Sequence, residues 1–158
     1  MVLGFEGAGT VAAMGPGVSD FRVGDEVYGT AGRFDAEYVT AKVEHIARIP
    51  KGLTMAQAGI LATSGLSALQ GIDDVLRLKA GETLIVHGAA GGVGTLAIQF
   101  AKLRGARVLA TATTAEGLSL IRRLGADAVV DGRSGDIADA ARALCPTRRG
   151  CRTRPRRW

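Results

Sequence analysis

The 158-residue sequence predicts an α/β chain in which a β-rich first third precedes three β-α repeats. Two observations support this prediction. In the first 50 or so residues, valines and aromatic residues stand between closely spaced glycine and proline turns, which is typical of short strands. From residue 83 onward the hydrophobic period alternates between strand and helix, which predicts parallel strands joined by right-handed crossover helices.

The β-rich region consists of short apolar segments that are separated by turns. Gly15-Pro16-Gly17 and Gly24-Asp25 are two of these turns, and Pro50-Lys51-Gly52 ends the region. This spacing favours a small barrel or sandwich. A helix is predicted to follow, because Thr54 and Gln57 have the spacing of a capping box.

The helical segment after this capping box connects the β-rich region to the repeats. It continues to about Leu78, and Gly59, Gly65 and Gly71 are predicted to interrupt it. A turn at residues 79–82 separates it from the first strand of the repeats.

The first repeat contains an apolar strand at 84–87 and a helix that ends at Gly105. His87 is expected to be packed and hydrogen-bonded within the strand rather than catalytic. The predicted inner face of the helix follows the i, i+3, i+4, i+7, i+8 spacing: Val93, Leu96, Ala97, Phe100 and Ala101.

The second repeat contains a strand at 107–112 and a helix capped by Thr114. Its predicted inner face is Leu118, Ile121 and Leu124. The third contains a strand at 128–130 and a helix at 136–144. With three strands, the sheet is expected to leave one side of its first strand unpaired. The segment "CPTRRGCRTRPRRW" at 145–158 has no hydrophobic period, which predicts an irregular tail from a shifted reading frame, with a genuine basic tail as the alternative.

Charge and composition exclude several classes of protein. The last 11 residues contain six arginines, so the tail carries more than the whole net charge of +5 and the rest is nearly neutral. Trp158 is its only stacking residue, so specific nucleic-acid recognition is poorly supported. No apolar run reaches a membrane span and no signal-peptide pattern begins the chain, which predicts a cytoplasmic protein. Two cysteines, Cys145 and Cys151, provide neither a disulfide framework nor a zinc ligand set.

A glycine-rich turn joins the first strand of the repeats to its helix. The N–H groups of a helix N-terminus suit a pyrophosphate, Gly91 is predicted to let the backbone approach it, and Gly94 to let the helix pack on the strand. This context predicts a dinucleotide site, with a tight turn that binds nothing as the alternative. The predicted contacts are Ala89, Ala90, Gly91, Gly92, Val93 and Gly94.

The end of the second strand predicts the nucleotide preference. An acid there would bind the ribose 2′-OH of NAD, but the chain has Thr111-Ala112-Thr113-Thr114 and no acid before Glu116. Hydroxyls without a carboxylate tolerate a 2′-phosphate, so NADP (NADPH) is favoured. Arg122 and Arg123 are interpreted as a solvated helix face. The predicted cofactor contacts here are Thr111, Thr113 and Thr114.

These segments resemble the medium-chain dehydrogenase/reductase superfamily, specifically its zinc-independent quinone oxidoreductase branch. "GETLIVHGAAGGVGTLAIQFAK" (81–102) is similar to the signature of that branch, and "GFEGAGTVAAMGPGVSDFRVGDEVYG" (4–29) to the GroES-like catalytic domain. "AEYVTAKVEHIARIPKGLT" and "GLSALQGI" also match in their places. The resemblance covers about residues 1–144.

The resemblance implies a fold and a division of the chain. The expected fold is a partial GroES-like β-barrel domain followed by the first half of a Rossmann parallel sheet, with truncation at both ends relative to the superfamily. The expected parts are a partial GroES-like domain at 1–53, a connecting helical segment at 54–82, a partial Rossmann NADP-binding domain at 83–144 and the basic tail at 145–158.

The resemblance also implies an activity: hydride transfer from NADPH to a quinone, an enone or a similar carbonyl acceptor. Ser67 matches a position near the nicotinamide, and Ala89 stands at the first fingerprint glycine. Gly117 departs from the pattern, because NADPH-using members often have a lysine there. No residue is identified as a general acid, and the catalytic residues are unknown.

No zinc is expected. The zinc-dependent branch has a Gly-His-Glu segment whose histidine binds the metal, and this chain has Gly4-Phe5-Glu6. Structural zinc needs a four-cysteine lobe, and the chain has no cysteine between Tyr28 and His45.

Three other interpretations stay open. The chain could be a catalytically inactive fragment with residual nucleotide binding, or a nucleic-acid-associated protein with a basic tail. It could also be an enoyl-thioester reductase or another zinc-free alcohol dehydrogenase-like reductase of the same superfamily. Quinone reductases of this superfamily often form homodimers through the last strand of the Rossmann sheet. The sequence contains no segment that predicts this strand, so a homodimer is not assumed here.

Overall fold

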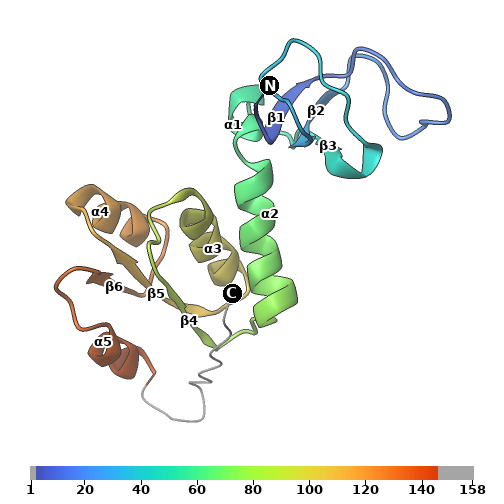
Figure 1. Cartoon of the computed structure of the whole chain (residues 1–158). Coiled ribbons are helices and arrows are strands. Elements are labelled where there is room, and N and C mark those ends of the chain that lie inside the picture. Colours follow the sequence, from blue (N-terminus) through green and yellow to red (C-terminus); the bar gives the residue numbers. More distant parts are fainter. Residues whose placement is uncertain (1–2, 146–158) are drawn as a thin grey trace. The chain divides into compact units, whose positions relative to one another are not determined.

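The computed structural model describes residues 3–145, so both interpretations of the tail lie outside the described residues, apart from Cys145. The chain forms two compact units, one covering Met1–Leu66 and one beginning at Ser67. Each unit contains one three-stranded sheet, antiparallel in the first and parallel in the second (Figure 1). No helix among residues 3–145 is long and apolar enough to cross a membrane.

The first unit is built on the strands β1 (Glu6–Thr10), β2 (Glu26–Thr30) and β3 (Ile46–Arg48), which pair in that order. A single 3-10 turn, Val43–His45, leads into β3. Gly29 is required where β2 passes this turn, because a Cβ there would collide with the turn's last carbonyl oxygen. The predicted β-rich region is therefore confirmed as an antiparallel sheet.

The capping box predicted after the β-rich region is present at α1 (Met55–Gly59). The Gln57 N–H donates to the Thr54 hydroxyl at 3.3 Å, and the Thr54 N–H donates to the Gln57 side chain at 2.9 Å. The helix ends at Gly59, as predicted.

The next helix, α2 (Ala62–Gln70), continues through Gly65, so the interruption predicted there is wrong. A glycine inside a helix costs about 1 kcal/mol relative to alanine but leaves the hydrogen-bond ladder intact. The Gly65 N–H indeed donates to the Leu61 carbonyl at 2.7 Å. The break predicted at Gly71 is also not found: the helix continues there, but as a π-helical turn that covers Gly71–Leu76.

The second unit has the predicted β-α-β-α-β-α order. Its strands are β4 (Thr83–Val86), β5 (Arg107–Ala112) and β6 (Ala128–Asp131), in the order β4-β5-β6. Its helices are α3 (Gly92–Leu103), α4 (Ala115–Arg123) and α5 (Ile137–Leu144). Figure 1 shows α3 and α4 on one face of the sheet and α5 on the other. Within the described chain β4 pairs with β5 alone, as predicted.

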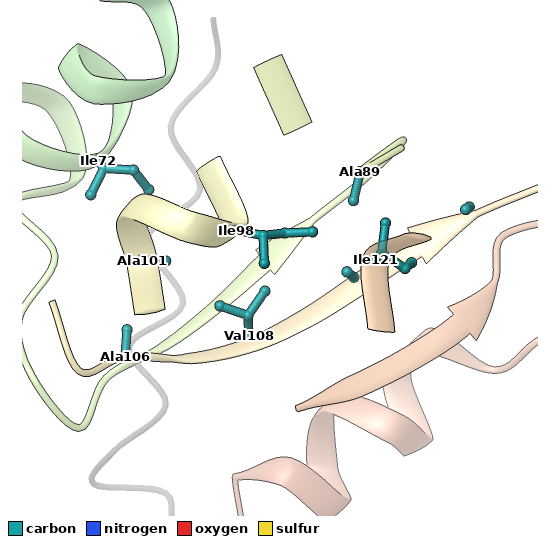
Figure 2. Packing of buried hydrophobic residues seen from close by; sticks show 9 residues of the cluster. Ile72, Ala89, Ile98, Ala101, Ala106, Val108 and Ile121 are labelled. Atoms are coloured by element: carbon teal, nitrogen blue, oxygen red, sulfur yellow. The ribbon is translucent and has the colours of Figure 1, made fainter. Parts of the chain in front are cut away.

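The core of this unit lies between α3, α4 and β5. Ile98, Val108 and Ile121 are fully buried there (Figure 2). The predicted face of α4 is confirmed, because Leu118 and Leu124 pack against the cluster around Ile121.

The predicted face of α3 is wrong in part. Val93 is 45% exposed, whereas Ile98, which was not predicted, is fully buried. Gly94 lies directly on the turn after β4. Because of this close approach, the side of the helix that contains Gly94, Ile98 and Ala101 faces the sheet. Phe100 is partly buried against the same cluster.

The far end of α3 is fixed by one carboxylate. Lys102 Nζ lies 2.7 Å from Asp127 Oδ2, and the Val108 N–H donates to the same oxygen at 2.7 Å. Burial raises the pKa of Asp127, but the hydrogen bonds from Lys102 and Val108 lower it more, so the pKa lies below its ordinary value of 3.8. The ionised carboxylate therefore stabilises the folded chain.

Replacing Asp127 with asparagine is expected to lower the free energy of unfolding by about 1 kcal/mol at pH 7. Because the folded-state pKa is lowered, this contribution is present above the ordinary pKa of 3.8 and is lost as the pH falls below it. Urea unfolding of both proteins at pH 7 and pH 3 measures the difference. Asp74→Asn, at an exposed residue without an ion pair in the described chain, is the control. A difference that persisted unchanged at pH 3 would contradict this account.

Candidate functional site

The glycine-rich turn begins at the carboxyl end of β4. The prediction that His87 is packed within the strand is wrong: β4 ends at Val86, and His87 is exposed in the turn. Gly88 follows with a φ of +61°, in the left-handed region that glycine adopts without strain. Gly91, the residue before α3, has an extended backbone and no side chain to cap the helix.

The turn is held by one residue of the neighbouring strand. The Thr111 hydroxyl accepts the Gly88 N–H at 3.2 Å, and the Thr111 carbonyl accepts the Ala89 N–H at 2.8 Å. Thr111 is 4% exposed, and it is the buried polar residue of the described core. The structure thus gives Thr111 contacts to the turn rather than an open position at the surface.

Several backbone N–H groups of the turn point to a binding function. The first donors of a helix have no partner within it, and here no side chain caps them. The Gly91 N–H donates to the Gly88 carbonyl at 3.2 Å. Within the glycine-rich turn and the first turn of α3, four N–H groups have no hydrogen-bond partner among residues 3–145: those of Ala90, Gly92, Val93 and Gly94. They and the helix dipole form a partial positive charge that attracts anions.

Gly94 and Gly91 are glycines for different reasons. A Cβ at Gly94 would lie 2.6 Å from the Cα of Ala89, which is fully buried beneath it, so the predicted packing role is confirmed. A Cβ at Gly91 would meet only the Gly88 carbonyl oxygen, at 3.5 Å, and the φ of −81° suits any residue. Neither packing nor backbone conformation within the chain requires glycine at 91.

The ends of the neighbouring strands lie beside this turn. Thr114 caps α4 and accepts the Gly117 N–H at 3.0 Å. Gly117 is buried, and a Cβ there would lie 3.1 Å from the Cβ of Ala90. Thr113 is exposed next to Thr114, at the end of β5. The structure therefore brings the turn, Thr113 and Thr114 to one edge of the sheet.

The remaining residues from the sequence analysis lie elsewhere. Ser67 is exposed on α2, and its side chain makes no hydrogen bond within the described chain. The structure does not join it to the turn. Arg122 and Arg123 are exposed in the last turn of α4, as predicted.

Sequence reasoning missed Arg133, which follows β6. The Gly132 N–H donates to the Ala112 carbonyl at 3.0 Å, and the Arg133 N–H donates to the Asp131 side chain at 2.9 Å. A Cβ at Gly132 would lie 3.6 Å from Thr113, so the chain passes close to the end of β5. Arg133 is the one lysine or arginine in the described turns that follow the three strands, and its guanidinium has no ion pair among residues 3–145. The sequence signal that could have identified Arg133 is its position in the turn directly after the third strand.

Comparison with known proteins identifies the family. The family model of the alcohol dehydrogenase GroES-like domain matches residues 1–64, and that of zinc-binding dehydrogenases matches residues 92–150. The structure of Escherichia coli quinone oxidoreductase complexed with NADPH matches 90% of the chain and 44% of its own, with a TM-score of 0.81 and 29% identity. The chain belongs to the medium-chain dehydrogenase/reductase superfamily.

Membership in this superfamily of oxidoreductases confirms the predicted fold class, a GroES-like part followed by half of a Rossmann sheet. The boundaries predicted at residues 53, 82 and 144 stay predictions.

Two further similar proteins are named for an activity other than quinone reduction. A mycocerosic acid synthase-like polyketide synthase of Mycobacterium tuberculosis is 41% identical over 141 residues, which is 89% of the chain and 7% of that protein. The CurK enoyl reductase structure matches 85% of the chain and 40% of its own, with a TM-score of 0.80 and 33% identity.

One matching family model is named for zinc, but the described side chains of this medium-chain dehydrogenase/reductase chain form no group that fits the ion. Phe5 stands in the Gly-Phe-Glu segment and is 82% exposed. His45 Nε2 lies 3.7 Å from Glu44 Oε1. No group of three or more histidine, cysteine, aspartate or glutamate residues in the described part could hold a metal. The expectation of no zinc stays a prediction.

Proposed function

We propose that this chain binds NADPH at the turn after β4. We propose further that the activity of the whole protein is hydride transfer from NADPH to a quinone, enone or similar carbonyl acceptor. The observation that supports this most is Gly91. The open space above it and the unpartnered N–H groups around it fit a pyrophosphate, and nothing inside the chain accounts for the glycine.

The residues present fit the dinucleotide. The N–H groups of Ala90, Gly92, Val93 and Gly94 would donate to the pyrophosphate oxygens. Bound NADPH supplies the hydride, and the protein supplies position and electrostatics. Ser67 is proposed to lie near the nicotinamide on the basis of the resemblance alone.

Three residues are proposed to favour NADPH over NADH. Thr113 and Thr114 stand where NAD-binding chains place an acid, so no carboxylate repels a 2′-phosphate there. Arg133 directly follows Gly132, which passes close to Thr113, and its guanidinium is proposed to pair with the phosphate. This arginine would compensate for the glycine at position 117.

Replacing Arg133 with glutamine is expected to weaken NADPH binding about tenfold, because a charge-assisted hydrogen bond to phosphate is worth about 1.5 kcal/mol or more. NADH, which lacks the phosphate, should bind both proteins equally. Fluorescence titration of each cofactor measures the two affinities. Arg123→Gln, in the exposed last turn of α4, is the matched control. Equal losses for NADPH and NADH would remove Arg133 from the 2′-phosphate site.

The hydride acceptor is tested in the same preparation. A quinone is favoured by the likeness to the Escherichia coli enzyme, and an enoyl thioester by the polyketide synthase relative and the enoyl reductase structure. NADPH oxidation is followed at saturating cofactor with 1,4-benzoquinone, with a crotonyl thioester and with neither. Oxidation with one acceptor identifies its class. NADPH binding without oxidation supports the inactive-fragment alternative, and the absence of NADPH binding contradicts the proposed function.

A further inference from the structure

We propose that Thr111 is a positioning residue: it holds the turn after β4 in the shape that a pyrophosphate needs and does not itself touch the nucleotide. This assignment rests on the proposed NADPH site and changes the role that the sequence predicts for Thr111. Its hydroxyl and its carbonyl hold two consecutive N–H groups of the turn, those of Gly88 and Ala89.

These two hydrogen bonds determine which donors remain for a ligand. They use the N–H groups of Gly88 and Ala89, and the Gly88 carbonyl in turn accepts the Gly91 N–H at 3.2 Å. A chain of hydrogen bonds therefore runs from β5 through Gly88 to the residue before α3. It holds Gly88, whose φ of +61° is left-handed, and leaves the N–H groups of Ala90, Gly92, Val93 and Gly94 without a partner in the described chain.

Burial keeps Thr111 away from the nucleotide. The residue is 4% exposed, and Gly132 lies near it, since a Cβ built on Gly132 would be 3.7 Å from both the Cβ and the hydroxyl oxygen of Thr111. A ribose would have to displace the turn or Gly132 to reach this hydroxyl. Thr113, two residues along, is exposed and free for that contact.

Burying the Thr111 hydroxyl costs free energy, and the hydrogen bond that it accepts from the Gly88 N–H offsets this cost. Valine has the same shape as threonine and suits a buried central strand, whereas a buried hydroxyl is unfavourable unless it is hydrogen-bonded. The same sheet provides the contrast: the Thr83 hydroxyl on β4 is buried without a partner. Thr83 is thus a matched control for removing a hydroxyl that holds nothing.

The test compares Thr111→Val, Thr111→Ser and Thr83→Val in the full chain, with NADPH and adenosine 2′-monophosphate as ligands. The second ligand carries the 2′-phosphate but no pyrophosphate. Thr111→Val should weaken NADPH binding about tenfold and leave adenosine 2′-monophosphate within about twofold. Thr111→Ser, which keeps the hydroxyl, should restore NADPH affinity, and Thr83→Val should bind like the unaltered chain. Unchanged NADPH affinity in Thr111→Val, or equal losses for both ligands, overturns the proposal.

A second readout needs no ligand. Amide hydrogen exchange of Gly88, followed by NMR, should be slow in the unaltered chain and in Thr111→Ser, and at least tenfold faster in Thr111→Val. If the unaltered chain does not bind NADPH, the proposed function fails, and the Gly88 exchange rate still decides whether Thr111 holds the turn. Equal exchange in all variants overturns the positioning role.

Discussion

Replacing Gly94 with alanine is expected to destabilise the second unit by about 3 kcal/mol or more, a large part of the stability of a small domain. The added Cβ would lie 2.6 Å from the Cα, 2.8 Å from the carbonyl oxygen and 2.9 Å from the carbonyl carbon of Ala89. All three are backbone atoms, so no flexible side chain can move aside. Ala89 is also held by Thr111 and is fully buried. Urea unfolding followed by circular dichroism measures the loss.

The matched control adds a side chain three residues earlier. Gly91→Ser meets only an ordinary contact with the Gly88 carbonyl, at 3.5 Å. Serine is also a preferred residue at this position before a helix, since its hydroxyl can accept one of the first N–H groups. Its free energy of unfolding should therefore equal or slightly exceed that of the unaltered chain. Similar losses in Gly94→Ala and Gly91→Ser would mean that the close approach at Ala89 is not what Gly94 provides.

The same Gly91→Ser change is expected to weaken NADPH binding about a hundredfold, or about 2.7 kcal/mol. The serine side chain would occupy the open space above residue 91, and its hydroxyl would take a donor that the pyrophosphate needs. Stability and affinity should thus change in opposite directions. Fluorescence titration with NADPH and thermal unfolding of the same sample measure both.

Two outcomes would contradict this expectation. If Gly91→Ser binds NADPH as tightly as the unaltered chain, the dinucleotide does not approach Gly91. If affinity and stability fall together, the variant is misfolded and the glycine has a structural role that the contacts of residue 91 do not account for. Gly94→Ala is no substitute here, because its expected loss of binding follows from the loss of the fold.

Local signals in the sequence predicted much of this fold. The capping box at Thr54 and Gln57 needs only neighbouring residues, and it forms as predicted. The order of strands and helices in the second unit follows from hydrophobic period, which is also local. The role of Gly94 could be predicted because a known strand-turn-helix context surrounds it.

Other features depend on contacts that the sequence does not encode locally. Helix α3 is apolar on two sides, so periodicity could not choose between Val93 and Ile98, and the contact at Gly94 decides. Strand β5 is buried on both faces, so alternation could not tell that Thr111 lies beneath the turn. The close approach of Gly132, the residue before Arg133, to Thr113 results from the parallel pairing of β5 and β6.

Helix α3 is held at both ends, at Gly94 on the turn and at Lys102 through Asp127. The direction of its dipole is therefore set by the sheet before any ligand arrives. An anion that approaches the N-terminus meets charges that are already oriented, so little reorganisation of the protein accompanies its arrival. The site is in this sense preorganised: folding, rather than binding, bears the entropy cost of ordering it.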